Sequence, residues 1–416
     1  MKITKEIKDI ILKRLSITIA IVLLIRIGTF LPVPGINHID LAFYIQKHSV
    51  TKSLVSTFSG DNTFIIGLFT LNIFPYINAS ILVQLLLSFS PQLSKLQKEG
   101  DLEGRQSINR LTRFITLIWS IIQSVSITLY LKQVLFDWNY FLAFEIIIWL
   151  TTGAIIVLWL SELITDYGLG NGASLLIYIN IISSLPNLCN KIIDEEKFSI
   201  SSGLLIILVI SIILYGIIFL QEGIRIIPLI SSKQLNQSLF QDSVNTNNYL
   251  PLRFNQAGVM PIILSTAILI VPNYISNLGL LPKMSFPINL EFFKFTYWIS
   301  YFLLILISSS FYSTIVLNPK DISDQLQKMS VTIPGIRPGI QTTFYLKKLI
   351  KRITLIGATM LAILVIVPNF IESTLNVTNL SRLSTTSLLI LAGVVLDLVR
   401  EVKNIYYSNI YNNRYE

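Results

Sequence analysis

The chain has 416 residues, of which 52% are hydrophobic and only 13% are charged, and its formal net charge is +9. A soluble domain usually carries about 25% charged residues, so this composition indicates a chain that lies mostly in lipid. One Cys and two His exclude a disulfide framework and a zinc-like cluster. We therefore expect no metal site and no cofactor.

Apolar stretches recur along the whole chain at about the length that crosses a bilayer. A membrane-spanning helix needs about 20 mostly apolar residues. Ten such runs lie near residues 16–31, 63–89, 114–131, 140–163, 172–185, 203–220, 257–275, 297–317, 353–370 and 383–399. The sequence predicts an all-α membrane protein with ten transmembrane helices, in which the run at 172–185 is short for a straight span.

Lys and Arg residues are distributed unequally between the two sides that ten spans define. An even number of spans places both termini on one side, which carries 23 of these residues against eight on the other. Cytoplasmic loops carry an excess of Lys and Arg. We therefore predict that both termini are cytoplasmic, or stromal in a plastid.

Two spans contain a central or early proline. Pro75 lies in LNIFPYINAS of the second span, and Pro261 lies in AGVMPIILSTA of the seventh. Proline removes a backbone donor, so each helix should be kinked or interrupted there. The prolines hold matching positions in two predicted five-helix halves, residues 1–186 and 187–416, and matched breaks point to a central site in inverted repeats. The alternative is a simple bend.

Eight motifs occur in a fixed order along the chain. They are RIGTFLPVPGI (26–36), FSGDNTFIIGLFTLNIFPYINASILVQLL (58–86), KEGDLEGR (98–105), WLSELITDYGLGNGASLLI (159–177), LPLRFNQAGVMP (250–261), FYSTIVLNPKDISDQLQK (311–328), IPGIRPGIQT (333–342) and TSLLI (386–390). This ordered set resembles the SecY family, the central channel subunit of the Sec protein translocon. The resemblance implies two pseudo-symmetric halves around a central pore, which translocates unfolded preproteins and releases hydrophobic segments sideways into the membrane. It implies no enzymatic activity.

The resemblance also assigns a ring of isoleucines to the pore constriction. These are Ile73, Ile77, Ile177, Ile263 and Ile390. The first two are four positions apart and share one helix face. An apolar collar gives water and ions no hydrogen-bonding partners, so it closes by dewetting. The alternative is that each isoleucine faces lipid or packs between helices.

The resemblance also implies a plug segment before the broken second span and a lateral gate on that span. The plug lies near residues 58–70, with Gly60 as a flexible entry, and includes Asn62, Thr63, Phe64, Ile65, Ile66 and Gly67. An ordinary loop would look similar. The gate seam is assigned to the polar side chains Asn72, Asn78, Ser80 and Gln84, for which helix-to-helix hydrogen bonding is the alternative.

Two arginines in the basic loops are assigned to partner docking. Arg337 lies in PGIRPG of the loop 318–352, where prolines and glycines should hold it in place, and Arg225 lies in the loop 221–256. The family implies a ribosome or a SecA motor as the partner, together with SecE-like and SecG-like small subunits, signal sequences of secretory preproteins and the lipid bilayer. The following run, Lys347, Lys348, Lys351 and Arg352, is explained equally well by topology.

Two other functions compete with a protein channel. A secondary transporter needs charged groups inside the bilayer, yet the supply in the spans is thin. Arg26, Glu145 and Asp397 form no obvious cluster, and we expect snorkelling of Arg26 and a packing role for Asp397. An intramembrane enzyme lacks the required constellation of residues. Abundant Ile and Asn with few Ala indicate an AT-rich genome, and we expect a plastid thylakoid membrane, the alternative being a bacterial plasma membrane.

Overall fold

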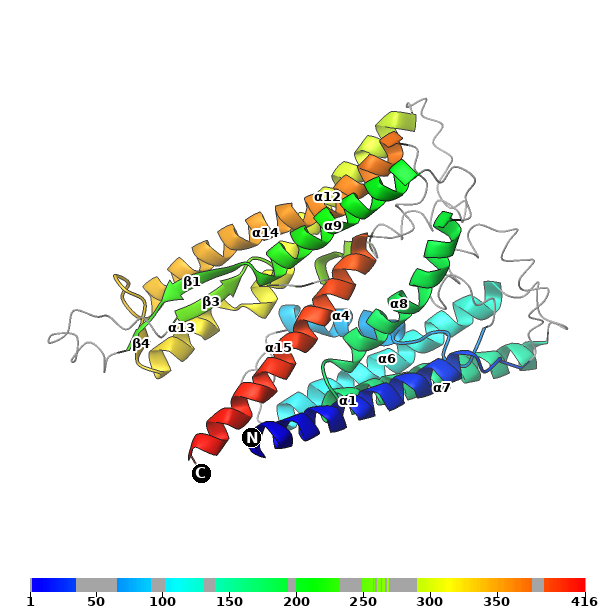
Figure 1. The fold of residues 1–416 in the computed structure, drawn as a ribbon, viewed down its shortest axis with the longest axis horizontal. Helices are drawn as coiled ribbons and strands as arrows, with labels where there is room; N and C mark the ends of the chain where they lie inside the picture. The colour runs from blue at the N-terminus through cyan, green and yellow to red at the C-terminus, as the bar shows by residue number, and fades with distance from the viewer. Residues whose placement is uncertain are drawn as a thin grey trace. The chain divides into compact units, whose positions relative to one another are not determined.

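The computed structural model describes residues 2–34, 66–90, 102–130, 139–193, 200–231, 249–256, 258, 260–262, 264–265, 268, 290–375 and 385–415. Most of these residues are helical (Figure 1). The helices are α1 (Lys2–Thr29), α4 (Phe74–Phe89), α6 (Leu102–Tyr130), α7 (Tyr140–Tyr167), α8 (Gly172–Ile193), α9 (Ile200–Glu222), α12 (Leu290–Val316), α13 (Pro319–Lys328), α14 (Ile340–Leu375) and α15 (Thr385–Tyr415).

Within the described residues, four helical stretches are long and apolar enough to cross a membrane. They are Gln106–Leu129, Tyr140–Tyr167, Trp298–Lys328 and Ile340–Val367. Shorter apolar stretches lie in α4, α8 and α9. The predicted run at 257–275 is only partly described, so the number ten stays a prediction.

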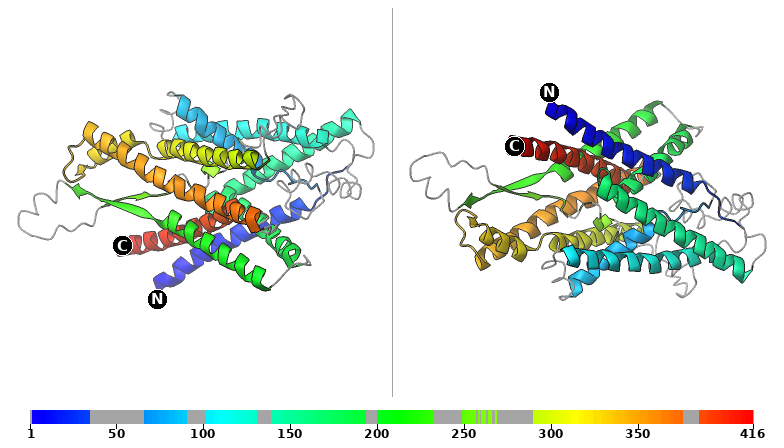
Figure 2. Two further views of the ribbon diagram at one scale, coloured as in Figure 1. Left: turned by 90° about the horizontal axis from the view of Figure 1, so that it is seen from above. Right: turned by 90° about the horizontal axis from the view of Figure 1, so that it is seen from below.

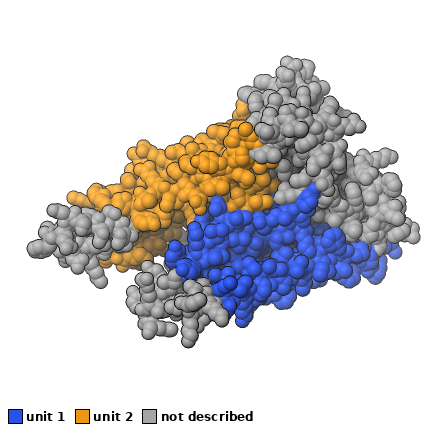
Figure 3. Space-filling view, in the orientation of Figure 1, with its two compact units in different colours: residues 1–196, 394–416 blue, residues 197–393 orange. Residues whose placement is uncertain are grey.

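The chain forms two compact units, which Figure 3 distinguishes by colour. Unit 1 contains residues 1–196 and 394–416, and unit 2 contains residues 197–393. In unit 1, α6 packs against α4 and α7, and α7 also contacts α1 and α8. The start of α1 and the end of α15 lie at the same end of this unit, as an even number of spans requires (Figures 1 and 2). In unit 2, α14 packs against α9, α12 and α13.

The second span is interrupted just before its proline. Residues 68–73 form consecutive turns, and α4 begins at Phe74 with Pro75 in its first turn. Asn72 has a φ of 49°, a left-handed conformation that Asn tolerates better than most residues, and its Oδ1 accepts a hydrogen bond from the Ile73 amide at 2.8 Å. The predicted interruption is confirmed, but the proline starts the helix and does not kink its middle.

The GLGNG motif forms the turn that reverses the chain between α7 and α8. Gly170 has a φ of 82°, which favours glycine. A Cβ on Gly172 would collide with the Ser161 carbonyl of α7, so only glycine permits this close approach. Asn171 caps α8, since its Oδ1 accepts a hydrogen bond from the Ala173 amide at 3.0 Å. This turn therefore fixes α8 tightly against α7.

The structure adds two features of secondary structure to those that the sequence predicts. The short run at 172–185 belongs to a longer helix, because α8 continues past Pro186 to Ile193. The basic loops are also not irregular throughout. They contain antiparallel strands, with β1 (Ile224–Pro228) pairing with β3 (Tyr249–Arg253) and β2 (Ile230–Ser231) pairing with β4 (Val331–Thr332).

The helix α13 lies inside the predicted loop 318–352. Its start has local signals, because Asn318 Oδ1 accepts a hydrogen bond from the Lys320 amide at 3.1 Å and Pro319 takes the first position. Asp321 in the first turn and Lys328 in the last also suit the helix dipole. The basic region of unit 2 is thus a folded layer.

Candidate functional site

The predicted ring residues fall into three groups. Ile73 and Ile77 are buried, at 1% and 6% exposed, and lie one turn apart where α4 begins. Ile177 in α8 is half-buried in the same unit. Ile390 in α15 belongs to unit 2 and is half-buried, and Ile263 lies outside the described residues. The structure therefore brings together the first two members of the ring.

The end of the predicted plug segment is joined to the chain after α1. The Val33 amide donates to the Ile66 carbonyl at 3.1 Å, and the Leu68 amide donates to the Leu31 carbonyl at 2.9 Å. Ile66 is 1% exposed. The remaining plug residues that the sequence names, Asn62, Thr63, Phe64 and Ile65, lie outside the described residues.

Three glycines allow this segment to lodge in unit 1. A Cβ on Gly67 would collide with the Thr29 carbonyl, one on Gly28 with the Phe69 ring, and one on Gly153 with a backbone carbonyl of the segment. Gly67 thus serves close packing at this end of the segment. Sequence reasoning missed Gly28 and Gly153, because their partners lie far away along the chain.

The four polar residues assigned to the gate have different surroundings. Asn72 is 3% exposed and bonds the next residue in the turn before α4, and the Ser80 hydroxyl donates to the Ile77 carbonyl of its own helix at 2.8 Å. Asn78 and Gln84 are half-buried on α4. The polar groups of Asn72 and Ser80 thus have hydrogen-bond partners within their own segments.

A stripe of buried hydroxyls on α6 was also missed. Its members are four positions apart, are at most 9% exposed, and each donates to a carbonyl of its own helix at 2.7–2.9 Å: Thr112, Thr116, Ser120, Ser124 and Thr128. Ser and Thr side chains are small, and their hydroxyls here already have hydrogen-bond acceptors in their own helix. Such residues let neighbouring membrane helices approach closely. The i, i+4 spacing of Ser and Thr in the sequence is the signal that could have revealed it.

Two side-chain hydroxyls brace the PGIRPG loop. The Thr342 hydroxyl donates to the Arg337 carbonyl at 2.9 Å, and the buried Ser323 hydroxyl of α13 donates to the Gly339 carbonyl at 3.0 Å. Gly335 and Gly339 have φ values of 75° and 102°, a left-handed conformation that favours glycine, so the chain can turn sharply on both sides of Arg337. The Arg337 side chain is exposed.

A small apolar core holds this loop and the β1–β3 ribbon against α14. Its buried members come from β1, β3, the residue before PGIRPG and the first turns of α14: Ile227, Leu252, Ile333, Leu346, Leu349, Ile350 and Ile353. Arg225, opposite Leu252 in the ribbon, is exposed. Both predicted docking arginines therefore project from one folded layer of unit 2.

The ionisable residues that the sequence singles out in the spans have separate surroundings, and a further pair, Arg113 of α6 and Glu162 of α7, is joined at 2.8 Å. Arg26 Nη2 donates to the Ile179 carbonyl of α8 at 2.6 Å, so Arg26 has a hydrogen-bond partner within unit 1. Asp397 pairs with Arg400 at 3.1 Å and is largely exposed, which corrects its expected packing role. Glu145 is exposed.

The chain matches the SecY family model over residues 67–399. It is 60% identical over 426 residues to the protein translocase subunit SecY of Trieres chinensis, with 100% of both chains covered. It also matches a solved structure on the plug domain of SecY, with a TM-score of 0.65 and 18% identity over 97% of this chain and 94% of that one. Canine Sec61 in a ribosome-channel complex matches with a TM-score of 0.62 and 17% identity over the same shares.

The helical fold and these likenesses define a multi-pass membrane protein that forms a protein-conducting channel and is not an enzyme. The chain belongs to the SecY family. The transporter and intramembrane-enzyme alternatives are therefore set aside.

Proposed function

We propose that Ile73, Ile77, Ile177, Ile263 and Ile390 form the constriction that seals this channel and parts around a moving polypeptide. The observation that carries the proposal is the placement of the first two. Both are buried, they are one turn apart, and they open a helix whose start is fixed by the turn at Asn72. A collar of branched apolar side chains excludes water yet can yield sideways, because no hydrogen bond has to break.

The plug is proposed to lie near residues 58–70, with Ile66 and Gly67 as its fixed end. Their backbone bonds to the segment after α1 support an anchor there, so the displaceable part precedes Ile66. The gate seam is assigned to Asn78 and Gln84, because Asn72 and Ser80 are satisfied within their own segments.

Arg337 and Arg225 are proposed to dock the partner that drives translocation, either a ribosome or a SecA motor. Exposed guanidinium groups on a braced surface suit the phosphates of ribosomal RNA or the carboxylates of a protein. Canine Sec61 is found in a ribosome-channel complex. SecE-like and SecG-like subunits and signal sequences are the further partners proposed.

The proposed location is the thylakoid membrane of a plastid, with a bacterial plasma membrane as the alternative. The Ile- and Asn-rich, Ala-poor composition supports an AT-rich plastid genome. Immunogold labelling of the source cells distinguishes the two.

Crosslinking tests the channel role of the ring. A photoreactive residue at Ile77 should crosslink to a secretory chain stalled during translocation. The matched control is Ile148, which is 47% exposed on α7 and should not crosslink to it. Equal crosslinking at both positions, or none at Ile77, would refute the assignment.

A further inference from the structure

Three residues form a buried hydrogen-bonded cluster between the Pro261 segment and α12, which we call the serine clasp (Pro261, Ser265 and Ser308). The Pro261 carbonyl lies 2.6 Å from Ser265 Oγ and 3.0 Å from Ser308 Oγ, and the two hydroxyl oxygens are 3.1 Å apart. Ser265 and Ser308 are 0% and 4% exposed. One hydroxyl from the Pro261 segment and one from α12 thus both donate to the Pro261 carbonyl.

The clasp joins two elements that the sequence separates by more than 40 residues. A serine hydroxyl has one proton, and Ser308 Oγ is within reach of three acceptors. Two of these, the Pro261 carbonyl and Ser265 Oγ, belong to the Pro261 segment, and the third is the Ile305 carbonyl of α12 itself at 3.1 Å. In a dry membrane interior no water competes for these groups.

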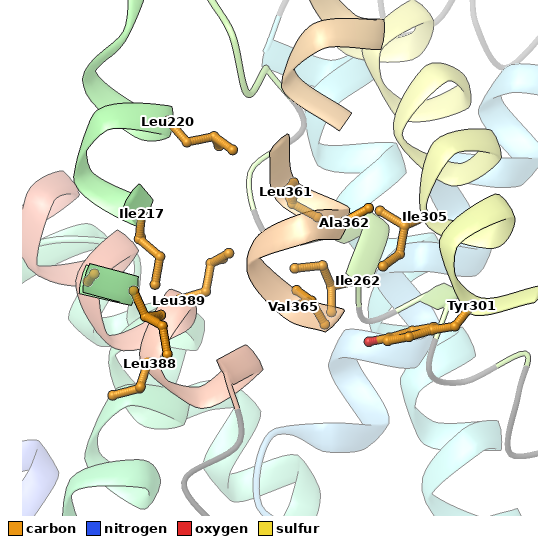
Figure 4. Packing of buried hydrophobic residues seen from close by; sticks show 12 residues of the cluster. Ile217, Leu220, Ile262, Tyr301, Ile305, Leu361, Ala362, Val365, Leu388 and Leu389 are labelled. Carbon is orange, nitrogen blue, oxygen red and sulfur yellow. The ribbon is translucent and has the colours of Figure 1, made fainter. Parts of the chain in front are cut away.

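The chain before the clasp is anchored as well. Gly258 has a φ of 62°, and its carbonyl accepts a hydrogen bond from Asn255 Nδ2 at 2.9 Å. A Cβ on Gly357 of α14 would collide with the Phe254 carbonyl, so the two backbones touch. Ile262, directly after the proline, is 1% exposed and lies beside Val365 of α14 in the core of unit 2 (Figure 4). The short stretch from Asn255 to Ser265 is therefore held at both ends.

We propose that the serine clasp is a positioning device for the channel constriction. It ties the backbone carbonyl two residues before Ile263 in the sequence to α12, and so restrains the described residues on either side of that position. This inference rests on the assignment of Ile263 to the constriction proposed above. Both hydroxyls donate to the Pro261 carbonyl, one from its own segment and one from α12, so this carbonyl is held from two elements.

Ion leakage through the closed channel, reconstituted in vesicles, tests the clasp. Ser265→Ala and Ser308→Ala should each raise the leak about threefold, the population change that matches an average interhelical hydrogen bond in a membrane. The double variant should leak no more than the stronger single variant, because both changes break the same cluster. Ser308→Cys, with similar volume and a weaker donor, replaces Ser308→Ala if the alanine variant does not fold.

Two further variants separate the possible explanations. Ser309→Ala removes a hydroxyl that is also buried, at 5% exposed, but lies outside the clasp, and its leak should equal that of the unchanged channel. Ile263→Ser should leak strongly. If Ile263→Ser leaks while both clasp variants do not, or if Ser309→Ala leaks as they do, the clasp is overturned and the ring assignment stands. If Ile263→Ser does not leak, the ring assignment fails and the inference fails with it.

Discussion

Arg26 of α1 and Ile179 of α8 are joined by a hydrogen bond of 2.6 Å from the guanidinium to the backbone carbonyl, although 153 positions separate them. A charged side chain within an apolar span needs a partner, and a carbonyl oxygen provides one without adding a second charge. The bond ties the first helix of unit 1 to the helix that carries Ile177, a proposed ring residue.

Loss of this bond should destabilise the protein. Arg26→Ala is expected to lower the free energy of unfolding by about 1.5–3 kcal/mol, the range for hydrogen bonds to charged groups. Thermal unfolding of the purified protein in detergent measures the change. Lys13→Ala, which removes an exposed cation from the same helix, is the control and should have little effect. Equal losses in the two variants would contradict the account.

The left-handed backbone at Asn72 gives a second prediction. Asn72→Gly should keep nearly full stability, whereas Asn72→Ala should lose about 1–2 kcal/mol, the cost of placing a Cβ in this conformation. The same thermal measurement applies. If the Asn72 side chain mattered and the backbone conformation did not, the glycine and alanine variants would lose the same amount of stability. Equal losses would therefore contradict the role of the turn geometry.

The hydroxyl stripe of α6 should resist enlargement. Ser124 is 0% exposed, so Ser124→Leu is expected to overpack the helix contact and to cost about 1–3 kcal/mol of unfolding free energy. Ser126→Leu is the matched control, because Ser126 is exposed on the same helix and also bonds only its own backbone. If the two leucine variants were equally stable, close packing along the stripe would not be its role.

Charge reversal at Arg337 tests the docking loop. Arg337→Glu should reduce translocation of a secretory precursor about tenfold or more while the protein still inserts in the membrane, because the change replaces attraction by repulsion at the partner surface. Ser323→Ala should act in the same direction more weakly, since it only loosens the loop. Arg352→Glu, in the run expected to anchor topology, serves as the control. Normal translocation by Arg337→Glu would rule out docking at this residue.

Much of this fold follows from local sequence signals. Apolar runs locate most of the spans. A chain segment in lipid must satisfy its own backbone hydrogen bonds, and a helix does so within the segment. The break before α4 is readable because proline suits a helix start and Asn tolerates the left-handed turn before it. The α13 helix was readable in hindsight from NPKD, whose Asn, Pro and Asp each favour a helix start.

The parts that were missed depend on residues far apart in sequence. The sequence around Arg26 does not predict that the Ile179 carbonyl accepts its hydrogen bond. The sequence around Gly153 does not predict that the Leu68 carbonyl lies against it. The strand IRIIP of β1 lacks the alternation that identifies a half-buried strand, because Ile226 and Ile227 are adjacent although only Ile227 is buried. The ring itself came from family resemblance, since an isoleucine that lines a pore and one that faces lipid look the same in sequence.

The most direct test of the channel account is ion leakage from vesicles that contain variants with serine at the ring positions, Ile73, Ile77, Ile177, Ile263 and Ile390. Serine hydroxyls should let water enter the constriction, so the resting leak should rise with each substitution. Ile148→Ser on the exposed face of α7 should leave it unchanged. An unchanged leak in the fivefold variant, with the protein folded and inserted, would contradict the account.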